Sequence, residues 1–272
     1  MPSTGHVRDV TYGTSEERLA AARASYEEVM TFPGPDPTKP YYDAGVVGFV
    51  FGEMWPRPGL SRRDRRWITL ACVGAAGAPI PIQTHLAASL RSGDCTLEEV
   101  REFNLVFATQ LGWPKGQVVD QYLGEAWARI VSERGEQPGA DDFVRWLEPA
   151  PPAERRARGR REYEAIMGAP APEPRTLFRG LGYVDYLYGE IWSRPTLSRR
   201  ERRIIAICCA ASIDHDVPAH LRAALETGDL GFEELQELVL HVAVYLGWLI
   251  AARLDDHLVE AWDAVQGARA AT

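Results

Sequence analysis

The chain has 272 residues, of which 46% are apolar and 10% aromatic, enough to build one large core or two of ordinary size. Its net charge of −8 provides no overall positive field for a phosphate backbone or an anionic membrane surface, so neither nucleic acid nor membrane is an expected partner. The four cysteines lack the spacing of a disulfide framework or a CxxC motif, and we expect reduced, mostly buried thiols at Cys72, Cys95, Cys208 and Cys209.

The N-terminal segment, residues 1–17, lacks the apolar region of a secretory signal. The most apolar run, residues 67–82, is interrupted by four Gly and Pro residues and is too short to span a membrane. We therefore expect a soluble, cytoplasmic protein. The first helix start follows at Thr14, because Glu17 stands three residues later, where a carboxylate answers a capping hydroxyl.

Further helix signals continue along the chain. The same capping spacing recurs at Ser61 with Asp64, Thr96 with Glu99, and Ser198 with Glu201. Gly93 and Gly228 follow the short segments 82–92 and 217–227 as left-handed stops. Apolar positions in EELQELVLHVAVYLG recur every three or four residues, and no stretch alternates as a strand would. The predicted fold class is all-α.

An internal repeat decides the architecture. Residues 52–66 read GEMWPRPGLSRRDRR and residues 189–203 read GEIWSRPTLSRRERR, with 11 identities in 15 positions at an offset of 137. Downstream the offset is 135, so that His85 pairs with His220. The second copy has therefore lost two residues just before its histidine.

The repeat predicts two copies of one helical unit, at residues 14–134 and 154–267, joined by a Pro-rich connector at residues 135–153. We expect roughly six helices in each copy. The simplest packing is a pseudo-dimer about a pseudo-twofold axis, because one chain then reproduces what a homodimer of the unit would form.

The order of motifs carries a family likeness. Each copy has a helix ending in GExWxRPxLSRR, a long apolar helix and a helix with the paired histidine, and the second copy continues with FEEL and LVLHVAVYLG. This order resembles the carboxymuconolactone decarboxylase family and its relatives, the AhpD-type alkylhydroperoxidases. The resemblance implies the same helical unit, here in tandem.

The peroxidase branch of that family places a CxxC pair seven and four residues before the histidine. The matching positions in this chain hold Ala78 and Pro81 in the first copy and Ile213 and Asp216 in the second. Without a thiolate pair there is no dithiol to reduce a peroxide. The sequence therefore excludes a thiol peroxidase, and the resemblance points to the branch without redox cysteines.

The decarboxylase branch implies a small-molecule substrate, an enolisable lactone acid, and needs no metal or organic cofactor. Loss of carbon dioxide beside a conjugated carbonyl leaves an enolate, so the site needs donors for the oxyanion and an acid to protonate carbon. Histidine, tyrosine and arginine suit these roles. The six-unit rings of the family further imply a homo-oligomer, with a trimer of this tandem chain as the expected form.

The histidines are the leading catalytic candidates. His220 and His85 occupy the family histidine position, at the first turn of the short helix. A lone histidine there is commonly a satisfied core residue, but its recurrence in both copies favours function.

A second candidate pair lies on the LVLHVAVYLG helix. His241 and Tyr245 are four residues apart and share one face, whereas the first copy has Val106 and Gln110 at these positions. A helix that faced only the core would favour valine over histidine, so this pair also indicates function. The second copy thus keeps more of the chemical groups, and the first copy is expected to act as its structural partner.

The ExWxR segment supplies the remaining candidates, namely Glu53, Trp55 and Arg57 in the first copy and Glu190, Trp192 and Arg194 in the second. A structural interpretation has the tryptophan anchor the helix end and the glutamate pair with an arginine across the boundary of the copies. A functional interpretation makes these residues substrate contacts. Glu190 would then be the base, because arginine replaces the family's site glutamate, at Arg66 or Arg203.

Two arginine runs, at residues 62–66 and 199–203, stand at helix N-termini, where the macrodipole disfavours cations. Ion pairs with an acidic partner surface, or a substrate carboxylate, would offset this. Asp216 and His220 could be two metal ligands at helical spacing, but no third ligand is evident, so no metal is expected.

These candidates predict a cofactor-independent enzyme that forms and discharges an enolate by general acid and base catalysis at His220, His241, Tyr245 and Glu190. The fused, unequal copies favour a dehydrating cyclase of natural-product biosynthesis that forms carbon–carbon bonds by Michael-type addition. One alternative is a decarboxylase of the 4-carboxymuconolactone type in aromatic catabolism. Another is a non-catalytic helical scaffold or small-molecule binder, for which the histidines would lie in separate packed cores.

Overall fold

The computed structural model describes residues 14–136 and 150–270, and every regular element within them is a helix. Most of the predicted connector, residues 137–149, lies outside the described residues. The helices of the first copy are α1 (Ser15–Met30), η1 (Tyr41–Met54), α2 (Arg62–Ala76), α3 (Pro79–Arg91), α4 (Leu97–Leu111) and α5 (Trp113–Glu133). Those of the second copy are α6 (Pro152–Met167), η2 (Phe178–Ile191), α7 (Arg199–Ile213), α8 (Val217–Thr227), α9 (Phe232–Leu246) and α10 (Trp248–Ala270). The described residues thus confirm an all-α fold with six helices in each copy.

The helix ends follow the local chemistry of the sequence. Ser61, Thr96 and Ser198 each form a capping box with the carboxylate three residues on. Gly93 and Gly228 adopt left-handed conformations, with φ of 74° and 73°. The first of the two short segments was predicted to begin too late, because a proline at N1 allows helix α3 to start earlier, at residue 79.

This earlier start changes the place of one candidate histidine. His220 lies in the first turn of α8, as predicted, but His85 lies in the second turn of α3. The prediction that both histidines open their helices is therefore wrong for the first copy. The extra turn of α3 takes up the two residues that the second copy lacks.

The segments before the two tryptophans are π-type helices, which the sequence did not indicate. Their backbone bonds span five residues, as from the Trp55 N–H to the Val50 carbonyl, 3.0 Å, and from the Trp192 N–H to the Leu187 carbonyl, 2.9 Å. Helix α6 approaches η2 closely because Gly159 carries no side chain. A Cβ at that position would lie 2.0 Å from the Val184 carbonyl oxygen.

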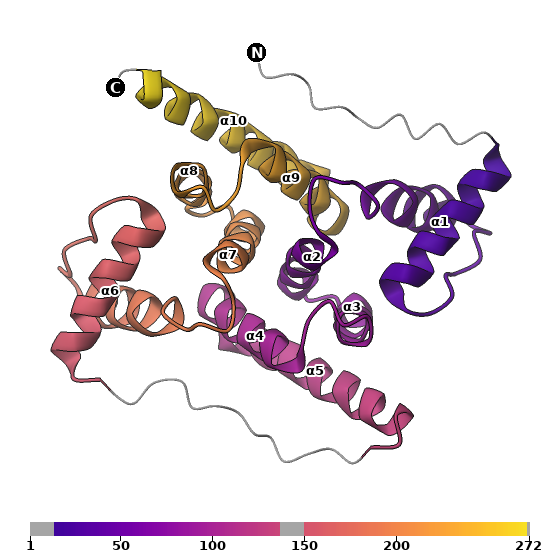
Figure 1. The fold of residues 1–272 in the computed structure, drawn as a ribbon, viewed down its shortest axis with the longest axis horizontal. Coiled ribbons are helices and arrows are strands. Elements are labelled where there is room, and N and C mark those ends of the chain that lie inside the picture. The colour runs from indigo at the N-terminus through magenta and orange to yellow at the C-terminus, as the bar shows by residue number, and fades with distance from the viewer. Residues whose placement is uncertain (1–13, 137–149, 271–272) are drawn as a thin grey trace.

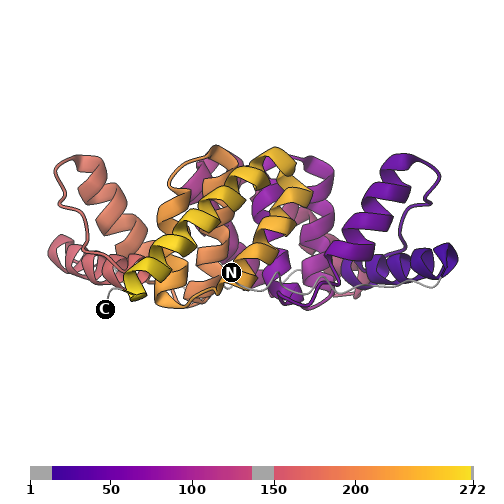
Figure 2. The same cartoon turned by 90° about the horizontal axis from the view of Figure 1, so that it is seen from above.

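The two copies share one core and are related by a pseudo-twofold axis, as Figure 1 shows. Helices α2 and α7 pack together at the centre, α2 also packs on α9, and α4 also packs on α7. Trp67 of α2 is fully buried, stacks on Phe103 at 5.8 Å and donates to Glu201 of the second copy at 3.0 Å. The pairs α1 with η1 and α6 with η2 form lobes on either side of the centre (Figure 2). The predicted pseudo-dimer is confirmed.

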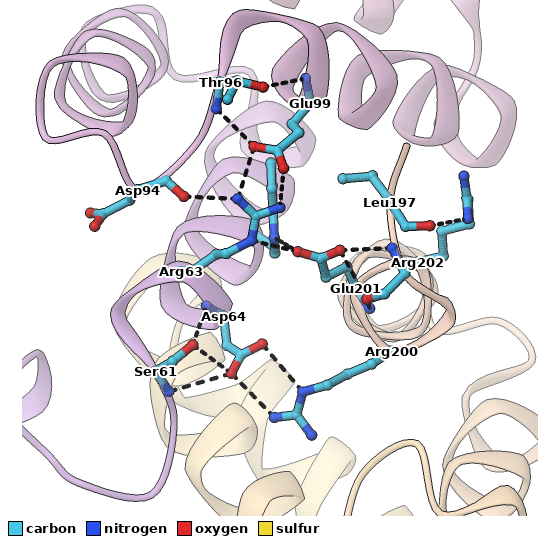
Figure 3. Close-up of polar contacts among 12 residues, drawn as sticks. Ser61, Arg63, Asp64, Asp94, Thr96, Glu99, Leu197, Arg200, Glu201 and Arg202 are labelled. Carbon is cyan, nitrogen blue, oxygen red and sulfur yellow. Dashed lines mark hydrogen bonds and ion pairs between the residues drawn. The ribbon is translucent and has the colours of Figure 1, made fainter. Parts of the chain in front are cut away.

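Reciprocal ion pairs mark the axis. Arg63 of α2 reaches Glu201 of α7 at 2.6 Å, and Arg200 of α7 reaches Asp64 of α2 at 3.2 Å (Figure 3). Arg63 also binds Glu99 in two-point geometry, with distances of 2.8 Å and 2.7 Å. Glu201 and Asp64 each complete the capping box of their own helix, so these two carboxylates serve both a helix end and the partner copy, whereas Glu99 caps α4 and pairs within the first copy.

All eight arginines of the two runs have carboxylate partners, namely Arg62, Arg63, Arg65, Arg66, Arg199, Arg200, Arg202 and Arg203. The prediction of ion pairs is thus confirmed, but the acids are not all on a partner surface. Arg63, Arg65, Arg200 and Arg202 reach acids of the other copy, whereas the acids that pair with the remaining four belong to their own copy. In the described ranges, no helix combines the length and the apolarity that crossing a bilayer requires.

Candidate active site

One cluster of candidate residues forms where α9 of the second copy crosses onto the first. His241 and Tyr245 pack against His85 of α3 and Trp55 at the end of η1. The Trp55 Nε1–H donates to the Tyr245 hydroxyl at 2.9 Å, and the His85 and Tyr245 rings meet edge to face with centroids 5.3 Å apart. Together with Thr69 of α2, these residues are called here the closed cluster.

His241 has a protein partner at each ring nitrogen. Its Nδ1 lies 3.4 Å from Arg65 Nη1, and its Nε2 lies 2.9 Å from Thr69 Oγ1. A guanidinium can only donate, so Nδ1 accepts and the proton is assigned to Nε2. Burial, with the nearby Arg65 charge, lowers the pKa of His241 well below its ordinary value. The ring is therefore neutral and leaves neither nitrogen for a substrate.

The other two titratable members of the closed cluster, His85 and Tyr245, are also held in their uncharged forms. Burial and the charge of Arg66 lower the pKa of His85 to about 3. Burial raises the pKa of Tyr245, although the hydrogen bond from Trp55 opposes this. The closed cluster thus combines two imidazoles and a phenol, whose rings pack directly against one another.

The pseudo-equivalent position around His220 is open. A cavity of about 440 Å³ lies there, between α4 of the first copy and η2, α7 and α8 of the second. Its polar and aromatic lining includes Gln110, Arg179, Tyr183, Tyr188, Asp216 and His220. The expectation of a pocket where the two copies meet is therefore met at this one of the two pseudo-equivalent positions.

The repeat explains why this position is open. At the offset of 135, Tyr245 corresponds to Gln110 and His241 corresponds to Val106. Val106 is fully buried in the core, and Gln110 lines the cavity. The phenol ring that packs on His85 in the closed cluster has no counterpart beside His220.

His220 is a neutral imidazole with a defined tautomer. Its Nδ1 lies 3.5 Å from Arg203 Nη1, and Asp229 fixes that guanidinium through a 3.2 Å contact. Because arginine can only donate, the His220 proton is assigned to Nε2. Burial, with the charge of Arg203, lowers the pKa of His220 to about 4. At neutral pH this side chain is an uncharged N–H donor on the cavity wall.

Two tyrosines of η2 face the same cavity. The Tyr183 and Tyr188 rings meet edge to face at 5.2 Å, and burial raises the pKa of both hydroxyls. They therefore stay protonated at neutral pH, and because the Tyr188 hydroxyl donates to Tyr183, the Tyr183 proton is the one that can be donated to a ligand. The Arg179 guanidinium lies 5.0 Å from the Tyr183 ring centroid and provides positive charge on the cavity wall.

The loop before α8 adds acidic and basic groups. His215 and Asp216 both line the cavity. Asp214 and Asp216 adopt left-handed conformations with φ of 53° and 59°, which cost energy in residues other than glycine. Within residues 14–136 and 150–270, no three His, Cys, Asp or Glu side chains cluster in a way that could hold a metal ion.

The predicted set of His220, His241, Tyr245 and Glu190 does not form one site. Helix α9 carries His241 and Tyr245 to the first copy, away from the His220 cavity. Glu190 pairs with Arg155 of its own copy at 2.7 Å and is not part of the cavity lining. The grouping is wrong because the copies exchange α4 and α9 across the axis.

The remaining predicted contacts serve the packing of the two copies. Arg57 binds Glu237 and Arg194 binds Glu102, each across the boundary, with nearest distances of 2.6 Å and 2.8 Å. Glu53 pairs with Arg18 of its own copy. The structural interpretation of this segment was therefore wrong for both glutamates, because it is the arginines that cross the boundary.

The lining that η2 supplies was not predicted from the sequence. Tyr183, Tyr186 and Tyr188 all line the cavity, and they stand just before the GEIW motif. A cluster of tyrosines next to a repeated motif was the available signal. Trp192 lies behind them, stacked on Tyr188 with ring centroids 6.0 Å apart.

Comparison with known proteins gives one family. The profile of the carboxymuconolactone decarboxylase family matches residues 40–123 and 181–254, one segment in each copy. The chain is 38% identical over 77 residues to 4-carboxymuconolactone decarboxylase of Acinetobacter baylyi, a match that covers 28% of this chain and 56% of that protein. The chain thus spans little more than half the length of this curated relative.

A solved structure also matches over most of its length. It is a protein of Burkholderia xenovorans LB400, provisionally described as a gamma-carboxymuconolactone decarboxylase subunit. The identity is 21%, the TM-score is 0.45, and the match covers 93% of this chain and 98% of that chain.

Proposed function

Because the chain belongs to the carboxymuconolactone decarboxylase family, we propose that it is a non-redox lyase that stabilises an enolate in the His220 cavity. The observation that carries this proposal is the state of His220. It is a neutral imidazole, its Nδ1 faces Arg203, and its Nε2–H is left for a ligand in the cavity. A neutral imidazole can polarise a carbonyl by donating a hydrogen bond to the carbonyl oxygen, and it need not be protonated to do so.

Decarboxylation is the reaction that this geometry supports best. The bond between the α-carbon and the carboxylate breaks, and its electron pair moves to the oxygen of the conjugated carbonyl. His220 Nε2–H donates to that oxygen as negative charge develops, and carbon dioxide leaves. The carbon then takes a proton from a protonated tyrosine of the cavity, such as Tyr183, which solvent reprotonates. No step needs a strong base, and His220, with its lowered pKa, is a weak one.

Arg179 provides a recognition element for the same substrate class. Its guanidinium lines the cavity and can hold a second carboxylate in two-point geometry. A carboxylate held there would keep the departing one near the aromatic wall, where its charge is poorly solvated. The proposed substrate is therefore a dicarboxylate with an enolisable carbonyl.

A dehydrating cyclase is the second candidate, and the loop before α8 favours it. Asp216 and His215 line the cavity and can accept a proton from carbon, which gives the same enolate without loss of carbon dioxide. The enolate would then attack a conjugated acceptor in the Michael sense, and water would leave. The cavity volume of about 440 Å³ suits a ring-bearing substrate. The setting in natural-product biosynthesis belongs to this candidate.

The test uses the two histidines as a matched pair. His220→Asn keeps an acceptor near Arg203 but removes the Nε2–H donor, and His85→Asn makes the same change in the closed cluster. The protein is incubated in D₂O with a panel of enolisable keto acids and unsaturated lactone acids. Carbon dioxide release, deuterium at carbon and ring closure are followed by mass spectrometry.

We expect His220→Asn to lower kcat/KM by roughly 10²- to 10³-fold, the usual effect of losing one oxyanion donor. His85→Asn should leave it within a few-fold of the original value. Carbon dioxide release identifies the decarboxylase, and ring closure with loss of water identifies the cyclase. Equal losses from both variants would contradict a single working site, and binding without any turnover would establish the non-catalytic binder.

A further inference from the structure

The two tryptophans of the repeat have equivalent ring neighbours but differ in the hydrogen bonding of their indole N–H groups. Trp55 stacks on Phe51 at 6.1 Å with Arg66 over its ring at 5.1 Å. Trp192 stacks on Tyr188 at 6.0 Å with Arg203 over its ring at 5.7 Å. The neighbours correspond at the offset of 137, so the two indoles have the same support.

Among the residues that the structure describes, only one of these indoles finds a hydrogen-bond partner. Trp55 Nε1 donates to the Tyr245 hydroxyl, whereas Trp192 Nε1 is buried and finds no acceptor in the described residues. Trp192 is 4% exposed, so water does not easily satisfy it. A buried donor left without a partner is costly, which makes this N–H a strong point of attraction for an acceptor.

The closed cluster indicates which acceptor fits. There a phenol lies beside the indole and the histidine, whose own rings stack with centroids 6.2 Å apart. Its hydroxyl accepts a hydrogen bond from Trp55, and its ring meets His85 edge to face. At the second position the repeat places the corresponding space beside Trp192, His220 and Gln110; the last two line the open cavity, and Trp192 lies behind its tyrosine wall. The Tyr245 side chain is thus an internal copy of a ligand for the other position.

We propose that the His220 cavity binds a phenol or a ring enol whose hydroxyl accepts a hydrogen bond from Trp192 Nε1 and whose ring lies against His220. This inference rests on the proposed function, because it takes that cavity as the substrate site. It adds the substrate class: a planar, hydroxylated ring. Trp192 Nε1–H then donates to the hydroxyl oxygen, while His220 Nε2–H donates to a second oxygen of the same substrate.

Binding of p-cresol, the side chain of tyrosine, tests the proposal on the intact protein, with toluene as the probe that lacks the hydroxyl. Dissociation constants are measured by ligand-observed NMR and calorimetry. We expect the ratio of the toluene to the p-cresol Kd to fall about tenfold in Trp192→Phe, the effect of losing one hydrogen bond to a buried donor. Trp55→Phe, the matched change in the closed cluster, should leave the ratio unchanged. An unchanged ratio in Trp192→Phe overturns the proposal.

A second variant covers the case in which Trp192→Phe fails to fold. Val106→His with Gln110→Tyr copies the closed cluster into the open position and should place a tyrosine hydroxyl on Trp192. We expect p-cresol binding to fall at least tenfold, because the new side chain occupies the subsite. Undiminished p-cresol binding in this folded variant would overturn the proposal.

These measurements need no turnover, so the two proposals can fail separately. If p-cresol binding depends on Trp192 but turnover is unchanged in His220→Asn, this inference stands and the proposed function is rejected. If turnover depends on His220 but the ratio of the toluene to the p-cresol Kd is unchanged in Trp192→Phe, this inference alone is rejected.

Discussion

Glu102→Gln is the sharpest test of how the two copies hold each other. Glu102 of α4 contacts Arg194 at 2.8 Å and 2.9 Å and Arg202 at 3.5 Å, all across the boundary of the copies. The Glu102 and Arg202 side chains are each 3% exposed, and burial already lowers the pKa of Arg202. Removing the carboxylate therefore leaves a buried guanidinium without the acid it contacts.

The expected cost is about 3 to 5 kcal/mol of unfolding free energy, the range for breaking a buried ion pair from one side. Glu237→Gln should cost a similar amount, because Glu237 binds Arg57 and the buried Arg65 in the pseudo-equivalent way. Glu133→Gln is the control. Its side chain is 53% exposed and pairs with Arg91, so its loss should cost under about 1 kcal/mol.

The assay is urea unfolding followed by circular dichroism. Because α2, α4, α7 and α9 build one shared core, both copies should unfold in a single transition, from which the free energy is extrapolated. If Glu102→Gln were no more destabilising than Glu133→Gln, or if the copies unfolded in two separate steps, the interlocked packing would not carry the stability assigned to it.

Further predictions concern the buried polar groups. The folded state keeps His85 and His220 neutral, with pKa values of about 3 and about 4, while the unfolded chain protonates them near 6.5. The unfolding free energy should therefore fall as the pH falls from 6.5 towards 4, by about 3 kcal/mol for His220 alone. In a variant that carries both His85→Asn and His220→Asn, the urea midpoint should depend less steeply on pH. Thr69→Val removes the partner of His241 Nε2 and should cost about 1 to 3 kcal/mol, whereas Thr109→Val, which loses only a bond to its own helix, should cost clearly less; equal costs would contradict the pairing. Sedimentation should give a trimer of the tandem chain, and a clean monomer would reject that expectation.

Much of the fold could be predicted because its signals are local or repeated. Ser61 and Ser198 start helices through carboxylates three residues away, and the doubling is visible as matching letters. The arginine runs demand acids for a reason that holds in any fold, namely their position at helix N-termini. Which acids these are depends on how the helices pack: Arg66 pairs with Asp94 of its own copy, whereas Arg65 pairs with Glu237 of the other.

The site was less predictable because its partners are remote in the chain. His241 was interpreted as functional since a core helix should prefer valine, but Arg65 and Thr69, 176 and 172 residues away, satisfy both its nitrogens. Nothing in the helical spacing of His241 and Tyr245 indicates which copy their helix will face. The cavity, likewise, depends on Gln110, which stands where the other copy has a tyrosine ring. The sequence does not indicate that this change leaves the buried Trp192 Nε1 without a partner in the described residues.

The exchange of α4 and α9 between the copies has a consequence for divergence. In a homodimer of identical units, a substitution on the crossing helix would alter both positions at once, because symmetry copies it. Joined in one chain, α9 faces His85 with His241 and Tyr245, while α4 faces His220 with smaller side chains. Covalent fusion has thus released one position from the constraints on its twin, so that a single gene encodes the equivalent of a heterodimer.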